Sequence, residues 1–190
     1  GAYDLSDEMR IYLLDKNFYK IRDMNLEEGN DLYERCLREF KHVSTGRSRD
    51  RRNYYFLVRI MSELSKTKDC QLSDKARYQI GVWYHSEHVP FAETKVVCRI
   101  FQDMADDESS MYRLKAAEAY ANIMFRSDAR SVIKYLKIAL ELNKPAIYYA
   151  LGIAYKEIDQ LDEGKPYIRQ AAKMGIKVAQ EKCKELKIDY

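Results

Sequence analysis

The sequence predicts an all-α protein of about ten helices. The chain of 190 residues holds only 7 glycines and 3 prolines, the residues that build most of the turns a sheet protein needs. Apolar residues recur at intervals of three and four along nearly the whole chain, which is the period of an amphipathic helix. Hydrophobic residues make up 46% of the chain and aromatic residues 12%, and this content excludes a disordered protein.

The first three helices follow from this spacing. The apolar stripe from Met9 to Ile21, behind Ser6 as a cap, indicates a first helix. A second stripe predicts a helix over residues 26–40, and dense apolar residues predict a third over residues 54–64. The polar segment 44–52 between them is expected to be a loop.

The next two helices are indicated by the residues at their starts. Ser73 has the residue type of an N-cap, and the helix behind it is expected to reach about His85. Pro90 fits the first turn of a fifth helix, because the first helical residues need no backbone N–H donor. Apolar spacing carries this helix to Met104.

Five helices are expected in the second half, over residues 110–126, 128–142, 145–158, 163–174 and 176–187. Four residues have the types that begin helices: Ser127, Asp128, Asn143 and Asp162. Gly175 is a stop signal between the last two helices. Pro166 falls inside the helix over 163–174, which should therefore start late or kink there.

A short pattern recurs three times along the chain. Ile80-Gly81-x-x-Tyr84 returns as Ala116-Ala117-x-x-Tyr120 and as Leu151-Gly152-x-x-Tyr155, at offsets of about 36 and 35 residues. The small residue lets a paired helix approach closely, and the large residues fill the space between helix hairpins. The recurrence therefore predicts stacked helix hairpins, with Gly152 at a helix–helix contact.

Residues 145–179 resemble a tetratricopeptide repeat and nearly as well a Sel1-like repeat, through Tyr148, Leu151, Gly152, Tyr155, Gly164, Ile168 and Ala171. Weaker matches extend the resemblance over about residues 75–187. We therefore divide the chain into an N-terminal helical segment, 1–70, and a repeat region with a C-terminal capping helix, 71–190. The resemblance implies a right-handed α-solenoid of stacked antiparallel helix hairpins.

In this family a concave groove, lined by the first helix of each hairpin, commonly takes an extended peptide or a partner helix. The repeat register assigns nine residues to its walls: Tyr78, Val82, His85, Leu114, Glu118, Asn122, Tyr149, Ile153 and Lys156. The family's best-known recognition pattern is a clamp of Lys and Asn side chains on a C-terminal carboxylate. The corresponding places here hold Leu114, Glu118, Tyr149 and Ile153, so we expect a mixed apolar groove suited to a hydrophobic or amphipathic segment.

Sequence motifs for catalysis, cofactors or metals are missing. There is no Gly-rich phosphate loop, nucleophile elbow or H-E-x-x-H motif. His85 and His88 share one helical face, but no neighbouring motif adds a third metal ligand beyond Glu87 or Cys98. We therefore expect no enzyme activity, no cofactor and no metal. The expected function is that of a scaffold, an adaptor or a sensory domain of a larger regulator, binding a protein or peptide partner.

The sharpest electrostatic feature is the cluster Arg47, Arg49, Arg51 and Arg52, a candidate anion-binding loop. It supports an alternative function, an RNA- or phosphate-binding helical-repeat protein that uses residues 46–52. Because 33 basic and 30 acidic residues give a net charge of only +3, the chain as a whole argues against nucleic acid as the partner.

The cysteines and the hydropathy of the chain bear on its compartment. The four cysteines form no C-x-x-C pair and are expected to be reduced thiols, as in a cytoplasmic protein. No apolar run is long enough to predict insertion into a membrane. The sequence gives no indication of the oligomeric state.

Overall fold

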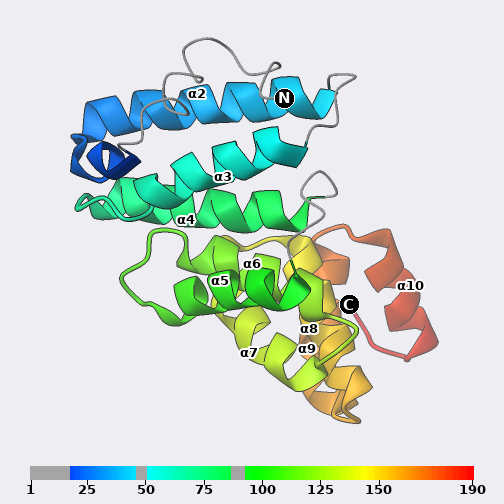
Figure 1. Ribbon diagram of the computed structural model, residues 1–190. Coiled ribbons are helices and arrows are strands. Elements are labelled where there is room, and N and C mark those ends of the chain that lie inside the picture. The colour runs from blue at the N-terminus through cyan, green and yellow to red at the C-terminus, as the bar shows by residue number, and fades with distance from the viewer. Residues whose placement is uncertain (1–17, 46–50, 87–92) are drawn as a thin grey trace. The chain divides into compact units, whose positions relative to one another are not determined.

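The computed structural model describes residues 18–45, 51–86 and 93–190, and every regular element among these residues is helical (Figure 1). The predicted all-α class is confirmed. Neighbouring helices in the chain pack against each other. The elements in order are η2 (Phe18–Asp23), α2 (Leu26–Thr45), α3 (Arg51–Leu64), α4 (Cys70–His85), α5 (Thr94–Asp106), α6 (Arg113–Met124), α7 (Ala129–Ala139), η3 (Leu140–Leu142), α8 (Pro145–Glu157), α9 (Leu161–Lys173) and α10 (Lys177–Glu185).

The chain divides into two compact units, one over residues 1–100 and one over residues 101–190. The division falls inside α5. It describes packing, whereas the sequence boundary after residue 70 marks where the repeat resemblance begins, and that boundary stays a prediction.

The described part of the first unit contains η2, α2, α3, α4 and the first residues of α5. Helix α3 packs against η2, α2 and α4. The centre of this unit is aromatic, because the Phe40 ring stacks on Trp83 at 4.4 Å between ring centroids and meets Tyr54 edge-on at 5.4 Å. Burial of large apolar and aromatic side chains is the main stabilising term for such a unit. Trp83 is the single tryptophan of the chain, so its fluorescence reports on this unit alone.

Polar side chains are also buried in this unit, among them Glu63 and Asn53. Glu63 on α3 is buried, and its carboxylate accepts hydrogen bonds from Arg22 of η2 and from Lys66 at 2.8 Å. The bond from Arg22 links η2 to the end of α3. Asn53 is completely buried, and neither atom of its amide has a hydrogen-bond partner, which costs about 1–3 kcal/mol.

The second unit packs α6 against α7, α7 against α8, α8 against α9 and α9 against α10. Helices α8 and α9 come very close together at Gly152 and Gly164. A Cβ atom built on Gly164 would lie 2.6 Å from the Gly152 carbonyl oxygen, and one built on Gly152 would lie 3.0 Å from the Gly164 carbonyl oxygen. Neither position has room for a side chain, so Gly152 lies at the helix–helix contact that the repeat pattern predicted.

The end of α5 is tied to α7 by polar contacts. The Asp106 carboxylate accepts a hydrogen bond from Lys134 at 2.7 Å and another from the Tyr135 hydroxyl at 2.9 Å. Tyr135 is otherwise buried, and burial raises the pKa of its phenol. The pair therefore satisfies a buried hydroxyl and holds the end of one helix on the side of another.

Helices α8, α9 and α10 end in the same way. After each helix, a backbone N–H donates to the carbonyl five residues earlier: Gln160 to Tyr155, Ile176 to Ala171 and Ile188 to Cys183. The residue before each donor has a left-handed φ, of 59° at Asp159, 94° at Gly175 and 53° at Lys187. This is the Schellman motif, and it confirms the stop signal at Gly175.

Among the described residues, the predicted helix starts are right in one case and wrong in four, and the predicted start residues Ser6 and Pro90 lie outside the described residues. Ser127 lies in the turn before α7 and does not cap that helix. Asp128 caps α7, accepting from the Ser131 N–H at 3.0 Å. Asn143 instead takes a left-handed φ of 49° and ends η3, a conformation that Asn tolerates well. Asp162 lies inside the first turn of α9, where a carboxylate also suits the helix dipole. Ser73 lies inside α4, which Asp69 caps.

Pro166 does not delay its helix, because α9 begins at Leu161 and runs through it. Pro166 is exposed, and so is Asp162 one turn earlier. The carbonyl that loses its helical donor to proline is therefore on the side that water can reach.

We expect Gly152→Leu to lower the free energy of unfolding by about 1–3 kcal/mol, because the new side chain must push α9 away from α8. Thermal melting followed by circular dichroism measures the effect. Ala146→Leu is the matched control, since Ala146 is exposed on the same helix and the change should cost less than about 0.5 kcal/mol. Equal melting of both variants would mean that α8 and α9 are not in close contact.

We expect Glu63→Gln to destabilise the first unit by about 1–2 kcal/mol at pH 7. The hydrogen bond from Arg22 lowers the pKa of Glu63, with burial opposing and Lys66 adding to the effect. A lowered pKa means that the stabilisation is complete above the ordinary value of about 4.3 and is lost as the pH falls through the folded value. The difference between wild type and variant should therefore shrink toward about pH 3.

Urea unfolding followed by Trp83 fluorescence at both pH values measures this difference. Glu34→Gln is the control, because Glu34 pairs with Lys75 at 3.1 Å on the exposed surface of the same unit and should contribute less than about 0.5 kcal/mol. A Glu63 effect that is the same at pH 7 and pH 3 would contradict an ionic role for this carboxylate.

Candidate functional site

The nine residues predicted to line a groove come from three helices in two units. Tyr78, Val82 and His85 lie on α4 in the first unit. The other six belong to the second unit: Leu114, Glu118 and Asn122 on α6, and Tyr149, Ile153 and Lys156 on α8.

The second unit contains a surface groove of about 480 Å³ between the end of α6 and the middle of α8. Seven residues line it: Asn122, Ile123, Phe125, Arg126, Tyr149, Ala150 and Ile153. The structure thus brings together three of the predicted residues, Asn122, Tyr149 and Ile153. We call these seven residues the α6–α8 groove.

The packing of α8 explains why Tyr149 and Ile153 reach this groove. Leu151, Gly152 and Tyr155 are buried toward the neighbouring helices of the unit. Tyr149 and Ile153 lie four residues apart on another stripe of the helix and are half-buried. They pack partly against the apolar cluster formed by α9, α10 and the residues after α10, and partly line the groove.

Four lining residues were missed from the sequence. Phe125 and Arg126 belong to the turn after α6, which ends at Met124 and not at residue 126 as predicted. Ile123 and Ala150 are neighbours of predicted positions on their helices. Helical spacing gives no signal for Phe125, because this residue follows the end of α6.

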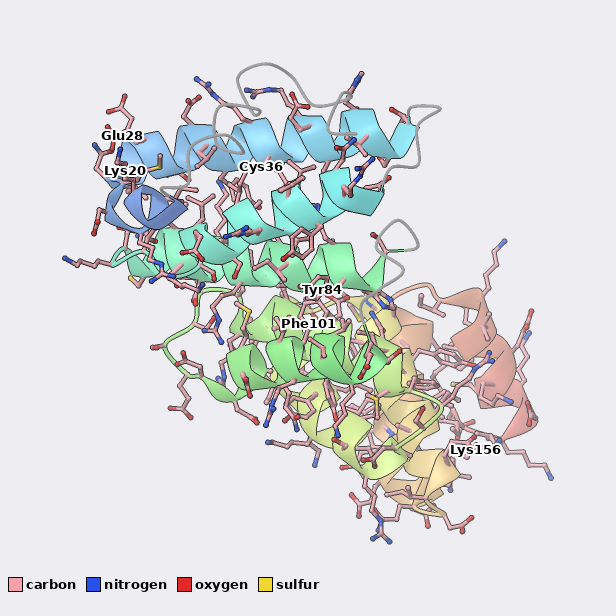
Figure 2. The ribbon with its side chains drawn as sticks, viewed as in Figure 1. Lys20, Glu28, Cys36, Tyr84, Phe101 and Lys156 are labelled. Carbon is pink, nitrogen blue, oxygen red and sulfur yellow. The ribbon has the colours of Figure 1, made fainter. Side chains whose placement is uncertain are left out.

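The other three predicted residues of the second unit lie outside the α6–α8 groove. Leu114 is half-buried near the start of α6. The Glu118 carboxylate accepts a hydrogen bond from Lys144 at 2.5 Å, which ties α6 to the residue before α8. Lys156, labelled in Figure 2, lies within electrostatic reach of Glu185 on α10 and helps to lower the pKa of that carboxyl, after the larger effect of Lys182.

The groove therefore combines an apolar surface with two polar ends. Phe125, Ile153 and the Tyr149 ring supply apolar area. Asn122 and Arg126 are exposed at its edge, and neither makes a side-chain hydrogen bond or ion pair within the described part of the chain. The cation that lines the groove is thus Arg126. The sequence had predicted Lys156 in this place.

The three signature tyrosines occupy packing positions. Tyr120 is buried, and its hydroxyl lies 3.0 Å from the Ser131 hydroxyl. Tyr155 is buried and stacks on Tyr167 at 5.9 Å. Tyr84 on α4, labelled in Figure 2, is half-buried, and burial raises the pKa of its phenol.

The arginine cluster is not a single loop. Arg51 and Arg52 form the first turn of α3, whereas Arg47 and Arg49 lie outside the described residues. The predicted start of this helix at residue 54 is therefore three residues late. Arg is a good helix former, so the helix can begin ahead of its apolar stripe.

No group of three or more metal-ligating side chains occurs within residues 18–45, 51–86 and 93–190. His85 is exposed at the end of α4, and His88 and Glu87 lie outside the described residues. Cys98 is buried, and burial raises the pKa of its thiol, which disfavours the thiolate that a metal would need.

Comparison with protein-family models, curated proteins and solved structures finds no match to this chain. The resemblance to tetratricopeptide and Sel1-like repeats therefore stays a prediction. None of the described helices is long and apolar enough to cross a membrane.

Proposed function

We propose that this protein is a non-catalytic interaction module that binds an amphipathic peptide or partner helix in the α6–α8 groove. The observation that carries the proposal is the meeting of Tyr149, Ile153 and Phe125 with Arg126 at one surface depression. The ligand should present an apolar side chain next to an acidic group.

The apolar side of the groove suits an anchor residue of the ligand. Tyrosine offers a large, rigid ring together with a hydroxyl, and it is enriched at the centre of protein interfaces for this reason. Tyr149 and Ile153 are one helical turn apart, so a single apolar side chain can contact both. Because part of each side chain is already fixed against the C-terminal cluster, binding orders little that is mobile beforehand.

The polar edge of the groove favours an acidic ligand. Arg126 can form a bidentate pair of hydrogen bonds with a carboxylate, which is among the strongest pairings for this side chain. Asn122 carries both a donor and an acceptor and can pair with a ligand backbone amide. These two groups give the site a preferred orientation and charge, whereas the apolar contacts supply most of the affinity.

The residue types at the groove support binding without catalysis. Its described lining offers a guanidinium, an amide and a phenol, but no carboxylate, imidazole or thiol. A nucleophile with an adjacent general base, the usual arrangement for covalent catalysis, is thus missing from this lining.

We expect Tyr149→Ala to weaken peptide binding by about 2 kcal/mol, close to thirtyfold in Kd. The peptides come from a display library of random sequences panned against the whole chain, and titration calorimetry gives the affinities. Tyr55→Ala is the matched control, because Tyr55 is an exposed tyrosine on α3 in the other unit and should bind the same peptides like wild type.

Two further variants separate folding from binding. Tyr155→Ala should unfold its helix pair, since Tyr155 is buried, so loss of binding there is not selective. Arg126 is exposed, so Arg126→Glu should keep the wild-type melting curve. The peptides that this variant selects should be basic instead of acidic. If Tyr149→Ala and Arg126→Glu both fold and select the same peptides as wild type, the groove is not the binding site.

A further inference from the structure

The last helix, α10, has little apolar surface with which to hold itself in place. It has nine residues and packs against α9 (Figure 1). Its buried residues, Ala179 and Cys183, have small side chains, and Ile188 is buried after the helix ends. Helices shorter than about 12–15 residues are marginal in water on their own. Helix α10 therefore depends on its docking, and a segment with few buried apolar contacts opens at a lower free energy than the unit as a whole.

The apolar cluster that α10 joins also reaches the α6–α8 groove. Ala179, Cys183 and Ile188 belong to this cluster, and Tyr149 and Ile153 of α8 pack against it. The same two side chains of α8 line the groove. Each of them thus contacts the C-terminal cluster and the groove at once, so the docking of α10 bears on the wall of the groove.

Charged side chains bring α8 and α10 together along the same stretch. The Lys182 ammonium donates to the Glu185 carboxylate at 2.5 Å, and this bond is the main cause of the raised pKa of Lys182. Burial opposes the shift, and the Tyr149 phenol contributes to it from α8. Lys156, also on α8, adds to the lowering of the Glu185 pKa by Lys182. Tyr149 and Lys156 therefore lie within electrostatic reach of α10.

We propose that α10 regulates the α6–α8 groove: docked α10 holds Tyr149 and Ile153 in the groove wall, and release of α10 takes this wall apart. The inference rests on the proposed function of the groove. A ligand that needs both side chains in place binds the docked state better than the released state, so it stabilises docking. Linkage makes the effect reciprocal, and anything that holds α10 in place raises the affinity of the groove for its ligand.

The Cys183 thiol can report the release of α10. It is fully buried, and burial raises its pKa, so N-ethylmaleimide reacts with it when α10 opens. When opening and closing are fast relative to labelling, the labelling rate follows the population of the open state. The whole chain is labelled and then digested, and mass spectrometry of the fragments separates Cys183 from Cys36, which is buried in the first unit.

Without any ligand, Tyr149→Ala should speed the labelling of Cys183 at least about fivefold, because the cluster that holds α10 loses an aromatic side chain. Val132→Ala is the matched control. Val132 is buried on α7, which packs against α6 and α8, so this change destabilises the same unit but should leave Cys183 labelling near wild type. Equal acceleration in both variants would mean that Cys183 reacts through unfolding of the whole unit. That result would overturn the proposal, as would an unchanged rate in Tyr149→Ala.

The second arm adds the tightest-binding peptide from the display selection at about 20 times its Kd. Because the released state lacks the groove wall and binds the peptide weakly, labelling of Cys183 should slow about twentyfold, while labelling of Cys36 stays unchanged. A peptide that needs Tyr149 for binding but leaves Cys183 labelling unchanged would overturn the regulatory role and leave the function of the groove intact. If no selected peptide needs Tyr149, the proposed function itself fails, and the regulatory role fails with it.

Discussion

The close approach of α8 and α9 at Gly152 and Gly164 is the constraint on which the second unit depends. The two backbones meet there with no side chain between them, so α9 can bury Ile168 against α8 and present its other side to α10. This packing fixes the rotation of α8 about its own axis. Tyr149 and Ile153 therefore lie at the boundary between the C-terminal cluster and the α6–α8 groove. A side chain at either glycine would separate the helices and move the wall of the groove.

The helices and the glycine contact could be predicted from the sequence because they follow from local spacing. Apolar residues at intervals of three and four identified the helices, and the small residue of the recurring pattern identified Gly152 as a contact. The helix boundaries were less accurate where a residue type serves two purposes. Asn143 can cap a helix start or adopt a left-handed φ at a helix end, and it does the second. Arg51 and Arg52 suit a polar loop and a helix equally well.

The composition of the candidate site could be predicted only in part, because it depends on contacts between residues far apart in the chain. Asn122, Tyr149 and Ile153 were found through the repeat register, which places positions on a helix face. The register placed Glu118 on the same helix face. Its pairing with Lys144 joins residues 26 positions apart, and helical spacing does not predict such a contact. Phe125 and Arg126 enter the groove through the turn after α6, and the path of a turn is not periodic. Asn53 likewise fits an apolar helix stripe, and only the packed unit shows that its amide is left without a partner.

The central claim is that an apolar side chain of a ligand enters the α6–α8 groove and contacts α8. Methyl-labelled isoleucine NMR on the whole chain tests this most directly, because Ile123 and Ile153 line the groove, whereas Ile21 and Ile60 are buried in the core of the other unit. On addition of a peptide selected by display, the account predicts that the Ile123 and Ile153 methyl signals shift and show nuclear Overhauser contacts to the peptide, while those of Ile21 and Ile60 stay in place. Shifts at other isoleucines, with Ile123 and Ile153 unchanged, would contradict it.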